Sequence, residues 1–160
     1  KYTLENPESE GMGTTIVMAL ITNEFLLFGN IGDSSGYVIK NHKLHKITVP
    51  HTLVNLLVQS GEITLEEAKN HPHKNVLMRV LGANMTVDMD IFDVERDIDG
   101  ILLGSDGLTN MLDDEQIEKV INEDLSIDDK IQKLINKCNN RGGTDNISVA
   151  YLEKERNHDK

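Results

Sequence analysis

Three aspartates stand in tight turns marked by glycine, each beside an apolar run, and they constrain any fold that this chain can adopt. A strand that ends in a small-residue turn holds its last side chain in a fixed direction. Three carboxylates brought together in this way repel one another unless a cation lies between them. Ligands that offer only oxygen suit hard cations such as magnesium or manganese rather than zinc or copper. The sequence therefore predicts a metal site formed by Asp33 in GNIGDS, Asp106 in LLGSDG and Asp145 in GGTDN.

Length and composition indicate one domain with an aliphatic core. The chain has 160 residues, of which 38% are hydrophobic, 27% charged and only 4% aromatic. The formal net charge of -11 argues against nucleic acid or an anionic membrane as the main partner. No run approaches the roughly 18 apolar residues that a membrane span needs, and no signal peptide opens the chain. We therefore expect a cytoplasmic protein.

The first 48 residues have the pattern of an antiparallel meander of two hairpins. Short apolar runs rich in β-branched residues predict buried strands, and turn-forming residues separate them. The strands are expected at 14–22 and 24–31, with Asn23 at the turn, and at 36–40 and 43–48, with Asn41 and His42 at the turn.

A small helical insertion is expected from residue 50 to about residue 82. Leucines recur there at helical spacing and Gly61 follows as a natural stop. The stretch from Thr64 to Glu67 has the form of a capping box, in which the two side chains satisfy each other's backbone N–H groups.

The second half of the chain groups its helices between strands. Because strands come first and helices do not alternate with them, the expected class is α+β rather than a parallel α/β sheet. Strands are expected at 86–94, 101–104 and 146–152, with two helices between the last two, the first capped by Asp113 or Asp114 and the second by Ser126.

A series of short motifs runs through residues 11–152. The motifs are Gly11-Met12-Gly13-Thr14-Thr15, Gly32-Asp33-Ser34, Val54-Asn55, Gly61-Glu62-Ile63-Thr64, Glu67-Ala68, His71-Pro72, Asn75-Val76-Leu77, Arg79-Val80-Leu81-Gly82, Ser105-Asp106-Gly107-Leu108 and Gly142-Gly143-Thr144-Asp145-Asn146-Ile147. Each is weak alone, but their order is that of one family. Together they resemble the metal-dependent type-2C serine/threonine protein phosphatases in their compact bacterial form.

The resemblance implies an antiparallel β-sandwich flanked by pairs of antiparallel helices, with the metal centre in a cleft at one end. It implies that Asp106 and Asp145 bind a catalytic metal, and that Asp33, together with Asp106, helps to hold a more labile one. The ions would be Mn²⁺ or Mg²⁺, two or three in the complete domain, and no organic cofactor is implied. The insertion at 50–82 resembles the family's flap, a segment beside the cleft that influences substrate access.

The activity that the resemblance implies is hydrolysis of phosphoserine and phosphothreonine on proteins, the targets of a serine/threonine kinase. A metal-activated water is the nucleophile, so no side chain of this chain is assigned a catalytic role. The family's segment before Gly11 normally carries an arginine that grips phosphate and an aspartate that bridges the metals, and residues 1–10 contain neither. The alternative is a non-catalytic phosphatase-like module with a binding or regulatory role.

These departures predict a fragment, incomplete at its amino terminus. We expect residues 1–10 to be a loop remnant, residues 11–152 a partial phosphatase domain and residues 153–160 a charged tail. A sandwich that lacks its first strands exposes edges and apolar faces, so the fragment is expected to be inactive and either to pair with another copy or to be poorly soluble.

Several residues allow a plainer interpretation. Aspartates such as Asp106 and Asp145 also cap helices or tighten turns. His51 either contacts substrate from the flap or is a satisfied surface histidine. Asp88 and Asp90 are two apart on a strand, where a solvated face is favoured over a second cation site. The single cysteine, Cys138, excludes an internal disulfide and is expected to be a buried structural thiol.

Overall fold

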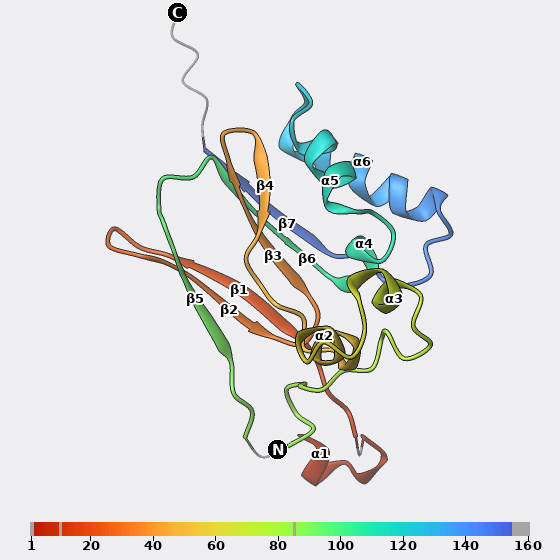
Figure 1. Cartoon of the computed structure of the whole chain (residues 1–160). Helices are drawn as coiled ribbons and strands as arrows, with labels where there is room; N and C mark the ends of the chain where they lie inside the picture. The colour runs from red at the N-terminus through yellow and green to blue at the C-terminus, as the bar shows by residue number, and fades with distance from the viewer. Residues whose placement is uncertain (1, 10, 85, 155–160) are drawn as a thin grey trace, which may run out of the picture.

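Two antiparallel sheets packed face to face, with helices on one outer face, make up the computed structural model of the chain (Figure 1). The structure describes residues 2–9, 11–84 and 86–154. One sheet has the strand order β1 (Ile16–Ile21), β2 (Leu26–Ile31), β5 (Asp90–Val94). The other has the order β4 (Lys43–Lys46), β3 (Ser35–Lys40), β6 (Gly100–Gly104), β7 (Val149–Glu153).

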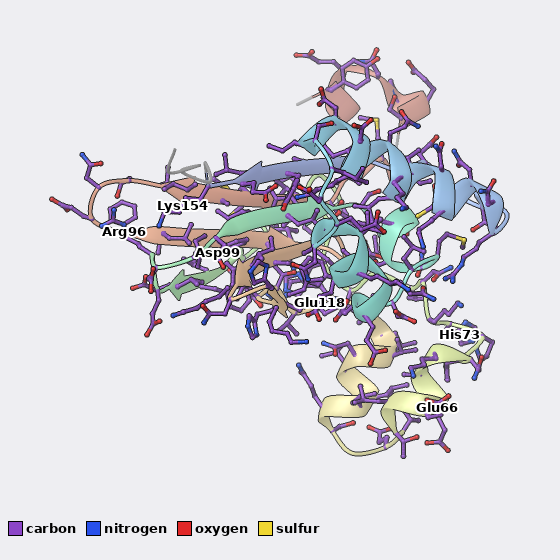
Figure 2. The ribbon with its side chains drawn as sticks, turned by 90° about the horizontal axis from the view of Figure 1, so that it is seen from above. Glu66, His73, Arg96, Asp99, Glu118 and Lys154 are labelled. Carbon is purple, nitrogen blue, oxygen red and sulfur yellow. The ribbon has the colours of Figure 1, made fainter. Side chains whose placement is uncertain are left out.

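The helices fall into two groups. The short α4 (Asp106–Thr109) and the longer α5 (Asp114–Ile121) and α6 (Ile127–Asn140) pack on the four-stranded sheet. The α2 (Leu53–Gln59) and α3 (Leu65–Lys69) helices belong to the predicted insertion, which we call the flap segment (residues 50–82). Figure 2 shows it projecting from the sandwich with Glu66 and His73, at the opposite end from Arg96 and Lys154. No helix in the described part of the chain has the length and apolar character of a membrane span.

Both predicted hairpins are present, but the prediction of a single meander was wrong. Strand β2 pairs with β1 and β5, whereas β3 pairs with β4 and β6, so the two hairpins lie in different sheets. The turn between β2 and β3 contains Gly32 with φ of 101°, a left-handed conformation that carries the chain out of the plane of the first sheet. The turn that holds Asp33 is therefore the crossing point between the two sheets.

Two other predictions about strands also need correction. Only residues 90–94 of the expected strand 86–94 form β5, because its partner β2 leaves the sheet just beyond Asn30, which faces Asp90. The last strand begins at residue 149 rather than 146 because residues 146–148 bond to the turn around Ser105 instead.

The ends of the chain differ from their description as a loop and a tail. Residues Tyr2–Glu5 form α1 and Pro7–Ser9 form a 3₁₀ helix, η1, where a loop was predicted. Glu153 still belongs to β7, and residues 155–160 of the predicted charged tail lie outside the described residues.

The core has two layers because side chains alternate along each central strand. Leu26, Phe28, Val38 and Ile101 fill the space between the two sheets. The opposite face of the four-stranded sheet packs on α4, α5 and α6 through Tyr37, Ile39, Leu102, Leu108, Ile117, Leu134 and Cys138. Cys138 is fully buried, as expected for a structural thiol.

Side-chain caps fix where the helices begin. Thr64 and Glu67 form the predicted capping box at α3, and Ser126 accepts a hydrogen bond at the start of α6. The sequence left the N-cap of α5 open between Asp113 and Asp114. In the structure it is Asp113, which forms a capping box with Gln116. Asp114 instead accepts a hydrogen bond from the buried Tyr37 hydroxyl at 2.9 Å and so ties α5 to β3.

Within the described residues, the helices that cover a face of the sandwich, α4, α5 and α6, lie on the four-stranded sheet. The outer face of the three-stranded sheet carries apolar side chains that are 40–59% exposed: Met18, Leu20 and Ile91.

Phe28→Ala should lower the free energy of unfolding by about 3–5 kcal/mol, because Phe28 is fully buried between the sheets. Phe25→Ala is the matched control, since Phe25 is 36% exposed at the β1–β2 turn, and should cost less than half as much. Urea denaturation of both variants measures the difference. Equal losses would contradict the assignment of the core to the space between the sheets.

Candidate metal centre

The pairing of β3, β6 and β7 brings the three aspartate turns to one end of the four-stranded sheet. Ser35, at the start of β3, pairs with Gly104, at the end of β6. Gly104 in turn pairs with Val149, at the start of β7. The turns just outside these paired residues contain Asp33, Asp106 and Asp145.

The second and third turns contact each other directly. The Ser105 N–H donates to the Ser148 carbonyl at 3.0 Å, and the Ser148 N–H donates to Ser105 Oγ at 3.0 Å. A side chain at Gly107 would place its Cβ 2.3 Å from the Asn146 carbonyl oxygen, so only glycine permits this approach. The glycine of the Ser-Asp-Gly motif is thus required for the two turns to meet.

The first turn is held from two sides. A Cβ on Gly32 would lie 2.3 Å from the Thr15 methyl group, and the Thr15 and Ser34 hydroxyls are 2.9 Å apart. On the other side, the Gly32 N–H donates to His51 Nδ1 at 3.1 Å and the His51 N–H donates to the Gly32 carbonyl at 2.9 Å. These contacts fix the backbone that presents Asp33.

The three carboxylates lie within one another's electrostatic field. The pKa of Asp33 is raised above its ordinary value, first by burial and then by the negative charges of Asp106 and Asp145. The pKa of Asp106 is also raised, again first by burial and then by the charge of Asp145. Like charges held together in a partly buried place favour a cation between them.

The donor set fits a hard cation in its chemistry but does not form a closed site by itself. Among the residues that the structure describes, no group of three or more His, Cys, Asp or Glu side chains is arranged to hold a metal ion. Asp145 is exposed and accepts its neighbour's N–H at 2.7 Å. Asp106 opens α4 and accepts a hydrogen bond from Asn110 at 3.3 Å. Asp106 and Asp145 therefore both form contacts within their own turns, and their cation-binding role stays a prediction.

His51 is buried, so its interpretation as a surface histidine was wrong, whereas contact with substrate from the flap stays a prediction. It is 8% exposed, and its Nε2 lies 3.0 Å from the Asp90 carboxylate. Asp90 also pairs with Arg79 at 2.6 Å and is not simply solvated, whereas Asp88 is exposed. Sequence analysis overlooked this cluster because its members are 11–39 residues apart, although His51 and Arg79 both stand in or beside family motifs.

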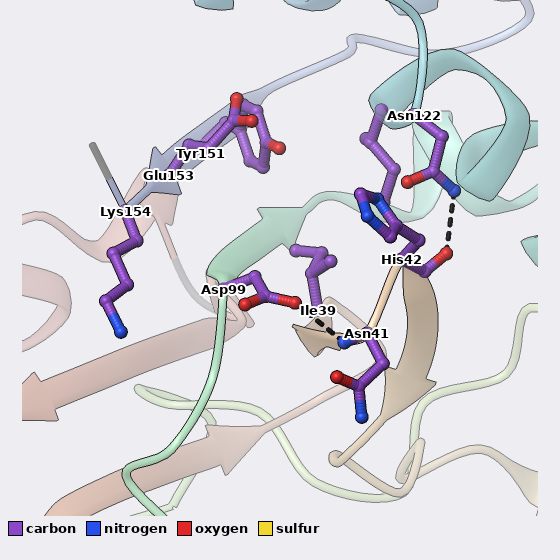
Figure 3. A pocket seen from close by; sticks show the side chains of 9 residues that line it. Ile39, Asn41, His42, Asp99, Asn122, Tyr151, Glu153 and Lys154 are labelled. Carbon is purple, nitrogen blue, oxygen red and sulfur yellow. Dashed lines mark hydrogen bonds between the residues drawn. The ribbon is translucent and has the colours of Figure 1, made fainter. Parts of the chain in front are cut away.

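A cavity lies far from the three aspartates. A cavity of about 540 Å³ adjoins the β3–β4 turn, at the other end of the four-stranded sheet (Figure 3). The Asn41 N–H donates to Asp99 at 2.6 Å and the Asn122 amide donates to the His42 carbonyl at 2.7 Å. These polar groups bind one another, and the sequence contains no motif at this place.

A family model for protein phosphatase 2C matches residues 3–150. The chain belongs to this family. It is 40% identical to serine/threonine phosphatase stp of Listeria monocytogenes over 155 residues, which are 96% of this chain and 62% of that protein. The structure matches serine/threonine phosphatase Stp1 from Staphylococcus aureus with a TM-score of 0.89 and 36% identity, covering 97% of this chain and 61% of that one.

A further solved structure is the catalytic domain of the serine/threonine protein phosphatase PstP in complex with two manganese ions. It matches with a TM-score of 0.81 and 31% identity, over 95% of this chain and 63% of that one. The chain thus spans about three fifths of the relatives that it matches.

Asp106→Asn should make the metal-free chain more stable at neutral pH, by less than about 1 kcal/mol because the site is only partly buried. Because the pKa of Asp106 is raised, its carboxyl binds more protons in the folded chain than in the unfolded chain above pH 3.8. The free energy of unfolding of the metal-free parent chain therefore falls as the pH rises from 3.8 through the raised pKa. The gain should shrink as the pH falls toward 3.8, and added Mn²⁺ should reverse the order by stabilising only the parent chain.

Thermal unfolding with and without chelator measures this effect. Asp93→Asn, on the exposed side of β5, is the matched control and should change little. A metal-free Asp106→Asn chain less stable than its parent at pH 7 would show that capping of α4 outweighs the repulsion.

Proposed function

We propose that this protein is a metal-dependent phosphatase that removes phosphate from phosphoserine and phosphothreonine on proteins. Membership of the protein phosphatase 2C family and the names of the relatives support this activity. The single observation that carries it in this chain is the convergence of Asp33, Asp106 and Asp145 at one end of the sheet, with raised pKa values at two of them.

Each aspartate has a distinct part in this proposal. Asp106 and Asp145, whose turns contact each other, would hold a catalytic ion, and Asp33, opposite Asp106, would help to hold a more labile one. The chemistry supplied by bound manganese or magnesium is the activation of water at neutral pH and the neutralisation of charge on the phosphoryl group. The hydrogen-bonded turns hold the backbone of the three aspartates close together, within one another's electrostatic field.

The choice of ion and the number of ions are part of the proposal. Support for manganese comes from the PstP structure, which is described as a complex with two manganese ions. The oxygen-only donors of this chain suit magnesium equally. Phosphorylated proteins, as targets of a serine/threonine kinase, are the proposed substrates, and a cytoplasmic location stays a prediction.

Mn²⁺ should bind this 160-residue chain, and Asp106→Asn should weaken the binding at least tenfold, as loss of a direct charged ligand requires. Electron paramagnetic resonance of free Mn²⁺ measures the affinity, with Asp93→Asn as the control. Hydrolysis of p-nitrophenyl phosphate in the same samples tests activity. No Mn²⁺ binding by the parent chain would contradict the proposed metal centre.

A non-catalytic role as a phosphatase-like module is the second candidate. The observation that favours it is the lack, among the described residues, of any group of three metal-binding side chains. Because residues 1–10 contain neither the arginine that grips phosphate nor the aspartate that bridges the metals in the family, we expect this chain alone to bind Mn²⁺ with little or no hydrolysis. Hydrolysis that disappears in Asp106→Asn would exclude the module for this chain.

We also propose that two copies of this chain associate through the edges of the sandwich. Strands β1 and β7 are both edge strands, and exposed Ile21 and Leu152 line adjoining apolar hollows between them. The double variant Ile21→Glu and Leu152→Glu should be monomeric in light scattering, whereas Leu65→Glu, on the exposed flap, should leave association unchanged. A parent chain that stays monomeric at high concentration would contradict this proposal.

A further inference from the structure

His51 grips the turn before Asp33 with two hydrogen bonds. Its backbone N–H donates to the Gly32 carbonyl at 2.9 Å, and its ring Nδ1 accepts the Gly32 N–H at 3.1 Å. Both polar groups of the Gly32 backbone are therefore held by one residue. Because Nδ1 accepts a proton donor, the ring proton lies on Nε2 and points to the other side.

The other side of the ring connects to the first sheet and to the flap segment. Nε2 donates to one carboxylate oxygen of Asp90 at 3.0 Å, and Arg79 donates to the other at 2.6 Å. Asp90 opens β5, where it pairs with Asn30, and the Asn30 amide donates to the same Gly32 carbonyl at 3.2 Å. The sheet end, the flap segment and the aspartate turn thus meet at this imidazole.

The two ends of the flap segment lie side by side at His51. The Met78 N–H donates to the His51 carbonyl at 2.8 Å, and Thr52 and Leu77 form an isolated bridge. Arg79 directly follows Met78 in the chain. Movement of the flap segment at its base therefore acts on His51 through two contacts, one from the backbone and one through Asp90.

The cluster joins a buried histidine to an exposed ion pair. His51 is 8% exposed, whereas the side chains of Asp90 and Arg79 are 36% and 43% exposed. An ion pair that accessible to water contributes little stability and opens readily. The buried histidine is held in place, and the exposed ion pair is the part that can break when the flap segment moves.

We propose that His51, Asp90 and Arg79 act as a positioning unit that couples the flap segment to the affinity of the Asp33 metal site. This inference rests on the proposed function, since it assumes that Asp33 helps to bind a divalent cation. Coupling between two sites is reciprocal, so metal binding near Asp33 should steady the flap segment, and loosening the flap segment should weaken the metal. None of the three residues needs to contact the ion or the substrate.

The test uses variants that separate the two arms of the histidine. His51→Gln keeps a polar group near the Nε2 position and loses the acceptor for the Gly32 N–H. His51→Asn does the reverse, keeping an acceptor near the Nδ1 position and losing the link to Asp90. Arg79→Ala breaks the exposed ion pair with little risk to the core, and Arg79→Lys retains the charge. Lys69→Ala is the control, because Lys69 pairs with Glu66 within the same flap helix.

Two quantities are measured on the 160-residue chain: Mn²⁺ affinity, and amide hydrogen exchange of residues 50–82 with and without MnCl₂. In the parent chain, Mn²⁺ should slow exchange in the flap segment. Arg79→Ala, His51→Asn and His51→Gln should lose this slowing, with Mn²⁺ binding weakened about tenfold. Arg79→Lys should restore part of both effects, and Lys69→Ala should match the parent.

The possible outcomes are distinct. Mn²⁺ binding by the parent with unchanged affinity and unchanged flap protection in Arg79→Ala and His51→Asn would overturn the coupling and leave the proposed function standing. No Mn²⁺ binding by the parent would overturn the proposed function and the inference together. A purely structural role predicts faster exchange in the variants with the Mn²⁺-dependent slowing preserved, and this result too would contradict the proposal.

Discussion

Repulsion between three like charges is the constraint around which this end of the molecule is built. Backbone pairing of β3 with β6 and of β6 with β7 holds the turns that contain the three carboxylates at one end of the sheet. Burial and neighbouring charge raise the pKa of Asp33 and Asp106, so the folded chain without a cation carries an electrostatic cost. The tightly packed glycines hold the turns in this arrangement, so the repulsion persists in the folded chain. A bound cation would offset it.

The elements that the sequence revealed are those defined by local chemistry. Capping boxes, apolar runs and turn residues located the hairpins and the start of α3, and the motif order indicated the family. The pairing of strands could not be predicted in the same way, because β2 and β3 have similar apolar patterns and only the left-handed turn at Gly32 sends them to different sheets. The metal-binding roles of the three aspartates remain predictions.

Polar contacts between residues far apart in the chain could not be predicted from the sequence for a related reason. Histidine, aspartate and arginine in separate segments carry no periodicity, so nothing local joined His51 to Asp90 or Arg79. In the fold these residues connect the flap segment, the first sheet and the turn before Asp33. Pro50 precedes His51 directly, and His51 is held in place by the hydrogen bonds of its backbone and its ring to Gly32.

The most direct test of the central claim is anomalous scattering at the manganese edge from crystals of this chain grown with MnCl₂. We expect a strong peak at direct coordination distance from Asp106 and Asp145, at the end of the sheet where β3, β6 and β7 meet their turns. A peak only at other acidic surfaces such as Asp97 and Asp99, or no peak at saturating manganese, would contradict it.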